Sequence, residues 1–298
     1  MKRLLALLLP CLLLFGAARA DAPVYSRTVT LHPGAPATTF TVYPDAGEVP
    51  QYPGDPAYRL EISRDGAETQ TLRFAHLGGD ELSPLLSFED VNMDGYADVS
   101  ALYAQGAANE TRTYFLWDEQ QSAFVPCDAL AGLSTHMLYP GQRVLFNHLH
   151  DSFLAGQDEL YCFPDGVPTL YRRFAITQLE PYEDEQYAAV ISEFSIDGQE
   201  TVLLSENFPL TLANEEGWQQ KYAEWEARFW QGIDPKEPPI SDSLYVNPNG
   251  GEHYHANAEC TAVSPELWPG MERIDRVMLN EAPYSALTPC EVCTGEHR

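Results

Sequence analysis

The sequence predicts a mainly β protein built from antiparallel strands. Short runs in which apolar and polar residues alternate recur along the chain, as in residues 25–31, 38–43 and 58–62. Turn residues separate many of these runs, which is typical of hairpins. Repeated short strands of this kind favour a meander, as in a sandwich, a barrel or a propeller. No clean repeat period is visible, so the pattern alone does not choose between these architectures.

Four hairpins can be placed by their turn residues. The first turns at Asp65-Gly66, and the second turns around residues 118–121. The third turns at residues 164–166, which read Pro-Asp-Gly, and the fourth turns at Asp197-Gly198. Each turn lies between two runs rich in β-branched and aromatic residues, which predicts a pair of adjacent antiparallel strands.

A helix is predicted over about residues 214–230. Asn214 is a suitable N-cap, and the acidic residues 215–216 suit the positive end of the helix dipole. Four aromatic residues at spacings of four, three and four define one face: Trp218, Tyr222, Trp225 and Phe229. This aromatic stripe predicts packing against the sheet, and a face that docks a partner is the alternative. A Pro-rich linker is expected to follow, up to residue 243.

The first twenty residues are predicted to be a signal peptide. A positive start at residues 2–3 precedes an apolar run over 4–15, and residues 18–20 read Ala-Arg-Ala, a cleavage site. The apolar run is too short to span a membrane, and no later stretch is long enough. Cys11 could mark a lipoprotein anchor, but its place inside the run favours a cysteine that is removed with the signal. The mature chain is therefore expected to be secreted or held in the cell envelope.

The charge balance argues against one class of partner. The chain has 17 Lys and Arg against 44 Asp and Glu, a formal charge of −27, and removal of residues 1–20 takes away three basic residues and leaves −30. A surface this acidic repels phosphate backbones, so nucleic-acid binding is not expected. It attracts cations and basic protein surfaces, although solubility alone would also account for it.

Residues 90–98 read Asp-Val-Asn-Met-Asp-Gly-Tyr-Ala-Asp and predict a calcium loop. Oxygen-bearing side chains recur on alternate residues and a glycine allows a sharp turn, which suits the flexible oxygen shell of Ca²⁺. The twelfth position is Ala101, where an EF-hand has a bidentate Glu, and the flanks look like strands. The expected ligands are the side chains of Asp90, Asn92, Asp94 and Asp98 and the main-chain carbonyl of Tyr96. A surface turn without an ion is the alternative.

The tail predicts a structural zinc site. One histidine and three cysteines can form a tetrahedral set, in which a Cys-x-x-Cys segment supplies two thiolates from one turn. A site with four protein ligands is closed, so it supports folding rather than catalysis. A disulfide and redox chemistry are the alternatives, and redox chemistry is the weakest because the motif does not follow a strand in a thioredoxin-like unit. The expected ligands are His255, Cys260, Cys290 and Cys293.

Two further signals concern residues of the β region. If three of the mature cysteines bind metal, Cys127 and Cys162 remain as one candidate disulfide, which export would allow. His148 and His150 alternate along a predicted strand and could bind a metal. A polar strand edge is the simpler interpretation of these two histidines.

The calcium segment resembles known families. Residues 86–99, Leu-Ser-Phe-Glu-Asp-Val-Asn-Met-Asp-Gly-Tyr-Ala-Asp-Val, resemble the FG-GAP/VCBS-type calcium loop of integrin-like propellers, and more specifically that of secreted or periplasmic bacterial XAC2610-related proteins. In that group a Tyr-x-Leu hairpin follows, here at 114–118, and later a Tyr-x-Phe-x-Asp-Gly strand pair, here at 161–166. The resemblance covers roughly residues 83–204 and implies a calcium-stabilised, propeller-like β domain. It implies no common activity, although inhibition of wall hydrolases is known within such families.

The tail resembles a short module appended to various secreted bacterial and nuclease-like proteins. The shared pattern is Tyr-His, then Cys, then Thr-Pro-Cys-x-x-Cys, and Ala286 stands where the module usually has Gly. The Cys-x-x-Cys segment is also similar to the zinc-bearing domain of Ada-type repair proteins. The acidic charge argues against carrying DNA binding over from them.

These observations predict four segments and one function. The segments are a signal peptide over 1–20, a calcium-binding β domain over 21–212, a helix and linker over 213–243, and a small α+β zinc-binding module over 244–298. The sequence contains no Gly-x-Ser-x-Gly, Walker, Rossmann or His-Glu-x-x-His motif. We expect an exported, non-enzymatic protein that binds an unknown protein or wall component, with basic character favoured. The alternatives are an inhibitor or immunity-type protein against cell-wall hydrolases, and a wall-directed hydrolase with unrecognised carboxylates.

Overall fold

The computed structural model describes residues 22–78, 84–152, 155–180, 185–211, 217–233 and 243–294. The predicted signal peptide and most of the predicted linker lie outside these residues. No helix in the described ranges combines the length and the apolar character needed to cross a membrane.

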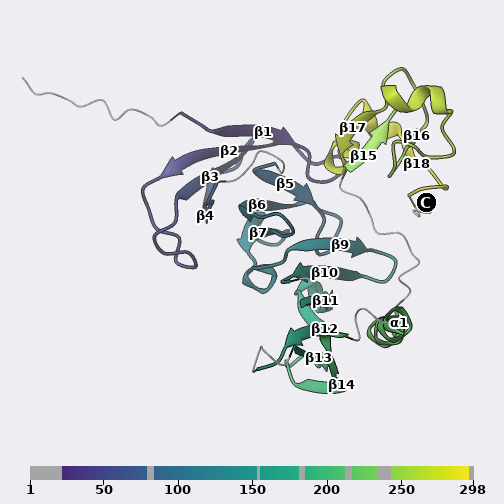
Figure 1. Ribbon diagram of the computed structural model, residues 1–298. Helices are drawn as coiled ribbons and strands as arrows, with labels where there is room; N and C mark the ends of the chain where they lie inside the picture. Colours follow the sequence, from purple (N-terminus) through teal and green to yellow (C-terminus); the bar gives the residue numbers. More distant parts are fainter. Residues whose placement is uncertain are drawn as a thin grey trace, which may run out of the picture.

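The fold is mainly β, as predicted, and its large sheets are antiparallel meanders that follow one another along the chain (Figure 1). The first sheet contains β1 (Tyr25–Val29), β2 (Thr38–Asp45), β3 (Ala57–Arg64) and β4 (Gln70–Ala75). The second sheet contains β5 (Leu86–Glu89), β6 (Asp98–Gln105), β7 (Glu110–Asp118) and β8 (Ala123–Pro126). The third sheet contains β9 (Thr135–Tyr139), β10 (Val144–His150), β11 (Gly156–Cys162), β12 (Thr169–Gln178), β13 (Gln186–Phe194) and β14 (Glu200–Pro209).

The four predicted hairpins are confirmed as the antiparallel pairs β3–β4, β7–β8, β11–β12 and β13–β14. Their turn glycines Gly66, Gly166 and Gly198 have φ values of +76°, +78° and +78°, a conformation that residues with a Cβ adopt only at a cost. A propeller-like arrangement is not confirmed. The first and second sheets have four strands, as propeller blades do, but the third has six.

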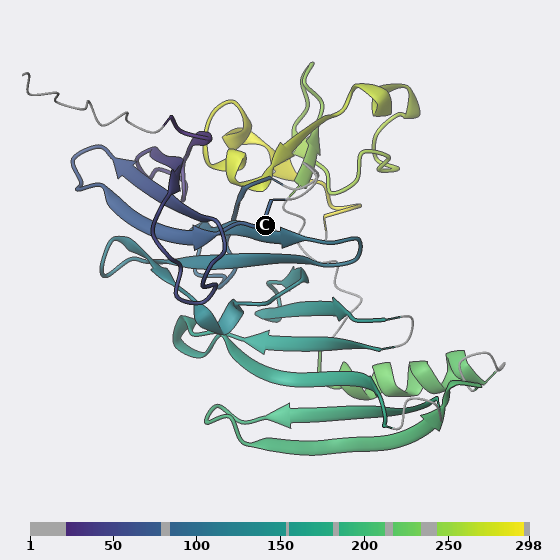
Figure 2. The ribbon, with the colours of Figure 1, turned by 60° about the vertical axis from the view of Figure 1, so that its left-hand side comes forward.

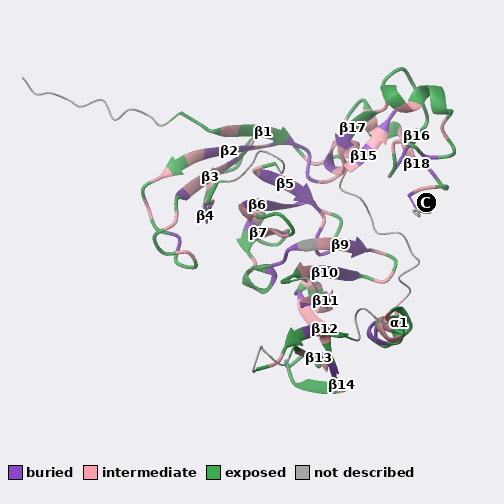
Figure 3. Ribbon diagram, in the orientation of Figure 1, coloured by how far each residue is buried: buried purple, intermediate pink, exposed green. Residues whose placement is uncertain are grey.

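The second sheet is covered on both faces, as the views in Figures 1 and 2 agree. Along β7, Phe115 and Trp117 pack into an apolar cluster shared with the first sheet. The alternate residues Tyr114 and Leu116 pack on the opposite face, in a cluster shared with Leu145 and other residues of the third sheet. Successive side chains of a strand point to opposite faces, so a strand between two layers needs apolar residues at every position. Buried segments accordingly concentrate in the middle of the molecule (Figure 3).

The helix α1 (Trp218–Phe229) covers the other face of the third sheet. Trp225 and Phe229 are each 1 % exposed and pack against residues such as Phe174, so the aromatic stripe does pack against the sheet as predicted. The described helix begins one residue after its N-cap, Gly217. The predicted N-cap, Asn214, lies outside the described residues.

The C-terminal unit is a separate small fold that rests on the first sheet. Its strands form two short ladders: β15 (Ser243–Val246) pairs with β17 (Glu272–Asp275), and β16 (His253–Tyr254) pairs in parallel with β18 (Thr288–Pro289). Three 3-10 segments complete it: η5 (Pro265–Gly270), η6 (Arg276–Asn280) and η7 (Tyr284–Ala286).

Contacts from η6 and its neighbours fix the C-terminal unit to the rest of the molecule. Val277 is 4 % exposed and belongs to the apolar cluster between the first and second sheets. The Asn280 side chain donates a hydrogen bond of 2.7 Å to the main-chain oxygen of Thr30, and Arg27 forms an ion pair with Asp275. The unit is therefore docked through both apolar and polar contacts, which the sequence did not predict.

Candidate metal sites

The predicted calcium loop, residues 90–98, joins β5 to β6, as expected of a loop between two strands. The carboxylates of the loop accept hydrogen bonds from backbone N–H groups of the same loop. The Asp90 oxygens accept hydrogen bonds from the backbone N–H groups of Asp94 and Gly95, both at 2.9 Å. Asp94 Oδ1 accepts one from the N–H of Tyr96, also at 2.9 Å. Asn92 donates from Nδ2 to Asp94 Oδ2 at 2.9 Å. The structure thus brings these four predicted residues together in one loop.

Asp98 ties the loop to the second sheet. Its side chain lies in the interior, since the residue is only 1 % exposed. Asp98 Oδ2 accepts a hydrogen bond of 3.0 Å from the N–H of Val91, and Oδ1 accepts one of 2.7 Å from the N–H of Trp117 on β7. Burial raises the pKa of this carboxyl well above its usual range. Asp98 therefore has a structural role in addition to the ligand role predicted from spacing.

The loop concentrates negative charge, and Arg143 and Arg276 line the cavity beside it. Burial, the largest cause, together with the neighbouring Asp94 raises the pKa of Asp90 to about 6, although the N–H of Gly95 opposes the shift. Within the described part of the chain, no Lys or Arg forms an ion pair with Asp90, Asp94 or Asp98. In the described residues Asp90, Asp94 and Asp98 do not form a set of three with converging ligand atoms, so the predicted calcium site stays a prediction.

A polar chain lies behind the loop, and the sequence analysis missed its members His136 and Tyr114. His136 on β9 places Nε2 at 2.7 Å from Glu89 Oε2 and Nδ1 at 3.1 Å from the hydroxyl of Tyr114. Glu89 directly precedes the loop and is 9 % exposed. These contacts connect the loop to both the second and the third sheet. The residues are far apart in the sequence, so spacing gave no signal for them.

Gly95→Ala is expected to destabilise the protein by about 1–2 kcal/mol. Gly95 has a φ of +96°, and a Cβ there would meet only His32 at 4.0 Å, so the cost comes from the backbone conformation rather than from a clash. Urea unfolding of both proteins measures the difference. The control is Gly217→Ala, at a φ of −74° with nothing within 4 Å. Equal unfolding midpoints for Gly95→Ala and the parent would contradict the prediction.

The four predicted zinc ligands converge in the C-terminal unit. One ligand atom from each of His255, Cys260, Cys290 and Cys293 lies within 4.8 Å of all the others. The parallel pairing of β16 with β18 explains part of this. Tyr254 is opposite Pro289, so the next residues of the two strands, His255 and Cys290, leave the ladder side by side.

The distances in this cluster fit tetrahedral zinc. The sulfurs of Cys260 and Cys290 are 3.8 Å apart, and Cys293 Sγ lies 3.7 Å from His255 Nδ1. A tetrahedral ion with bonds of about 2.3 Å to sulfur and about 2.0 Å to nitrogen requires S–S and S–N edges of about 3.8 and about 3.5 Å. A disulfide would need about 2.05 Å, so the cysteines are not drawn together as a disulfide pair.

The surroundings of the cluster also favour a metal. His255, Cys260 and Cys290 are 8 %, 3 % and 4 % exposed. Burial lowers the pKa of His255, which keeps a neutral imidazole available as a ligand. Burial and the neighbouring Cys260 raise the pKa of Cys293 to about 12, so without a metal this group stays a thiol at neutral pH. A divalent ion would displace such protons on binding.

The remaining predicted groups do not form a metal site in the described residues. Cys127 and Cys162 are both half-buried and unpaired in this structure, and their disulfide stays a prediction. His148 Nδ1 lies 2.6 Å from Asp158 Oδ1, but the rings of His148 and His150 are 6.3 Å apart. In the ranges that the structure covers, the His255 group is the one set of three or more such side chains with converging ligand atoms.

Comparison with known proteins gives a remote likeness. No family model matches the chain, and no curated protein matches it. A solved structure described as a Xanthomonas type IV secretion system related protein is similar over 62 % of this chain and 98 % of its own length, with 14 % identity and a TM-score of 0.40. A likeness this remote assigns neither a family nor a function.

Proposed function

We propose that this chain is an exported, non-enzymatic binding protein whose β domain is stabilised by calcium and whose C-terminal unit is held by zinc. One observation carries the calcium assignment above the others. Asp98 is 1 % exposed and Asp90 is half-buried beside Asp94, and no ion pair among the described residues joins a Lys or Arg to either carboxylate. Burying a carboxylate without an opposite charge is costly even where backbone N–H groups donate to it, and a bound cation would lower that cost.

Calcium fits the donor set better than a softer ion. The candidate ligands are all oxygens: side chains of Asp90, Asn92, Asp94 and Asp98 and the carbonyl of Tyr96. The loop adapts its backbone around them, with positive φ at Met93 and at Gly95. An ion here would neutralise the carboxylates and fix the loop against the second sheet.

Zinc fits the C-terminal unit because the donors there are soft, whereas those of the loop are hard oxygens. Three sulfurs and one imidazole nitrogen form a soft, closed set at His255, Cys260, Cys290 and Cys293. Four protein ligands leave no open position for a substrate, so this ion would support folding. Two ions in supporting roles favour a rigid binding surface over a catalytic centre. The formal charge of −30 for the mature chain favours a basic partner.

The test is a melting experiment on the mature protein with Asp94→Ala as the variant. Calcium at 100 to 1,000 times its Kd should stabilise the parent by about 3–4 kcal/mol, which raises its Tm by about 5–10 °C. The variant should melt lower in calcium and, with zinc kept saturating, its Tm should not depend on whether calcium is present. Elemental analysis should give one calcium and one zinc per folded chain.

The control for this test is Asp65→Ala, which removes the same charge from an exposed hairpin turn. It should keep the full calcium response of the parent. If, at saturating zinc, the parent itself melts at the same temperature with and without calcium, calcium has no stabilising role and the assignment is wrong.

A further inference from the structure

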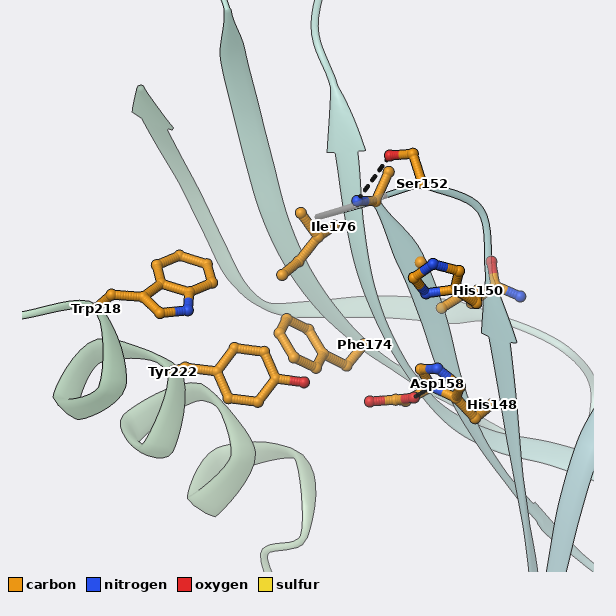
Figure 4. A pocket seen from close by; sticks show the side chains of 11 residues that line it. His148, His150, Ser152, Asp158, Phe174, Ile176, Trp218 and Tyr222 are labelled. Carbon is orange, nitrogen blue, oxygen red and sulfur yellow. Dashed lines mark hydrogen bonds and ion pairs between the residues drawn. The ribbon is translucent and has the colours of Figure 1, made fainter. Parts of the chain in front are cut away.

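A pocket of about 250 Å³ opens between the start of α1 and the third sheet (Figure 4). Its apolar side is lined by Trp218 and Tyr222 from the helix and by Phe174 from β12. Its polar side is lined by Asp158 from β11 and by His148 from β10. Two features that the sequence singled out, the aromatic stripe and the alternating histidines, thus meet at one place.

The aromatic stripe divides into two halves with different roles. Trp225 and Phe229 are almost fully buried in the core, whereas Trp218 and Tyr222 remain partly exposed. The ring centroids of Trp218 and Tyr222 are 5.8 Å apart, and those of Tyr222 and Phe174 are 5.9 Å apart. The second half of the stripe packs the helix onto the sheet, and the first half lines the pocket.

Asp158 supplies a carboxylate with one oxygen that can still accept a hydrogen bond. Its side chain is 15 % exposed, and Oδ1 lies 2.6 Å from His148 Nδ1. Oδ2 accepts no hydrogen bond from the described residues. The hydroxyl of Tyr222, which also lacks a hydrogen-bond partner there, points across the pocket toward this carboxylate (Figure 4). Burial raises the pKa of Asp158, the expected result for a carboxyl poorly compensated by its surroundings.

The nearby Arg and Lys side chains do not compensate this charge, and His148 compensates it only in its protonated form. On the neighbouring strand Arg173 pairs with Glu159, and on the helix Lys221 pairs with Glu206. Glu226, one helical turn beyond Tyr222, repels Asp158 electrostatically and so adds to the negative potential. The pocket therefore combines aromatic rings with a desolvated negative charge.

We propose that this pocket binds an organic cation, an alkylammonium or guanidinium group, with Asp158 as its counter-ion. Cations are attracted to the faces of aromatic rings, and this attraction strengthens when water is excluded. A charge-assisted hydrogen bond to Oδ2 would fix the orientation of the group. The net negative charge of the protein would raise the rate of encounter with such ligands. The pocket lies on the face of the third sheet opposite the calcium loop, so the proposal depends on neither metal.

The first arm of the test compares two probes on the unmodified mature protein by isothermal titration calorimetry. N-acetyl-arginine methylamide carries the guanidinium group, and N-acetyl-citrulline methylamide has the same shape without the charge. We expect the arginine probe to bind at least about tenfold more strongly. Equal affinities for the two probes would overturn the proposal, as would no binding of the arginine probe at millimolar concentration. Methyl glucoside serves as an uncharged sugar probe, and its binding in place of the arginine probe would also overturn the proposal.

The second arm uses Asp158→Asn, which keeps the shape of the side chain and removes its charge. Affinity for the arginine probe should fall about tenfold or more, and Trp218→Ala should also weaken binding. Asp197→Asn, in the β13–β14 turn, is the matched control and should bind as the parent does. A folded Asp158→Asn variant with parental affinity would contradict the proposal. If that variant does not fold, the probe comparison on the parent decides.

A third arm identifies the source of the cation. The peptide Gly-Gly-Arg-Gly-Gly presents the same group on a longer main chain. If it binds about tenfold more tightly than the blocked amino acid, the pocket takes a side chain of a polypeptide partner. Equal affinities would assign a free small cation as the ligand. In both cases the pocket binds through the same chemistry.

Discussion

Cys290→Ser is expected to release zinc and to unfold the C-terminal unit while the three large sheets stay folded. The unit has a small core, with Leu244, Val246, Tyr254 and Ile274 as its buried members. Such a core contributes little on its own, whereas structural zinc in small domains contributes about 10 kcal/mol or more. Removing one thiolate breaks the closed set and leaves the other ligands uncompensated.

Hydrogen exchange by mass spectrometry measures this outcome region by region. Protection should disappear over residues 243–294 and persist in β5–β14. The first sheet should show an intermediate loss, because Val277 of η6 fills part of its apolar cluster. Cys162→Ser is the matched control, since the same substitution outside the cluster should leave the zinc content at one per chain. A Cys290→Ser protein that retains zinc and protection would show that the cluster does not hold the unit together.

The parts of the structure that the sequence predicted are those encoded by neighbouring residues. The hairpins follow from turn residues such as Asp65-Gly66 and Asp197-Gly198, whose conformational preferences act within a few positions. The loop of residues 90–98 between two strands is a single nonapeptide, and its oxygen spacing is visible directly, while its calcium stays a prediction. The cluster of one His and three Cys spans more sequence, but His and Cys in a metal-binding pattern are rare enough to be noticed.

The parts that the sequence did not predict depend on which layers meet. The consecutive apolar residues 114–117 of β7 are consistent with a strand buried on both faces. Their pattern does not predict that the first and third sheets are the two layers that cover it. Asp98 fits a ligand position by spacing, yet its bond to the N–H of Trp117 comes from a strand 19 residues away. The pocket at Asp158 likewise exists only because α1 folds back onto β10–β12.

The pH dependence of stability is expected to reverse in direction when calcium is present. The pKa of Asp90 in the folded protein, about 6, lies above its ordinary value of 3.8. Between these two values the folded state binds more protons than the unfolded state, so without calcium stability falls as the pH rises through this window. A shift of this size corresponds to about 3 kcal/mol, and burial of Asp98 acts in the same direction.

Calcium reverses the slope of stability against pH because it binds the ionised carboxylates and competes with protons. At a pH above about 6 the loop is ready to bind, and the stability that calcium adds is fully present. At a pH near 4.5 protons displace the ion and that stability is lost. The calcium-loaded protein should therefore become more stable as the pH rises over the same range in which the calcium-free protein becomes less stable.

Melting temperatures between about pH 4.5 and about pH 7.5 measure both slopes, with calcium-free protein prepared by chelation and dialysis. Asp90→Asn keeps the size of the side chain but cannot ionise, so it should flatten the calcium-free slope and weaken the calcium-dependent one. Asp65→Asn removes a carboxylate from an exposed turn and should preserve both slopes, which separates the loop from the general charge of an acidic protein. Slopes of the same sign with and without calcium would mean that the buried carboxylates of the loop are not balanced by this ion.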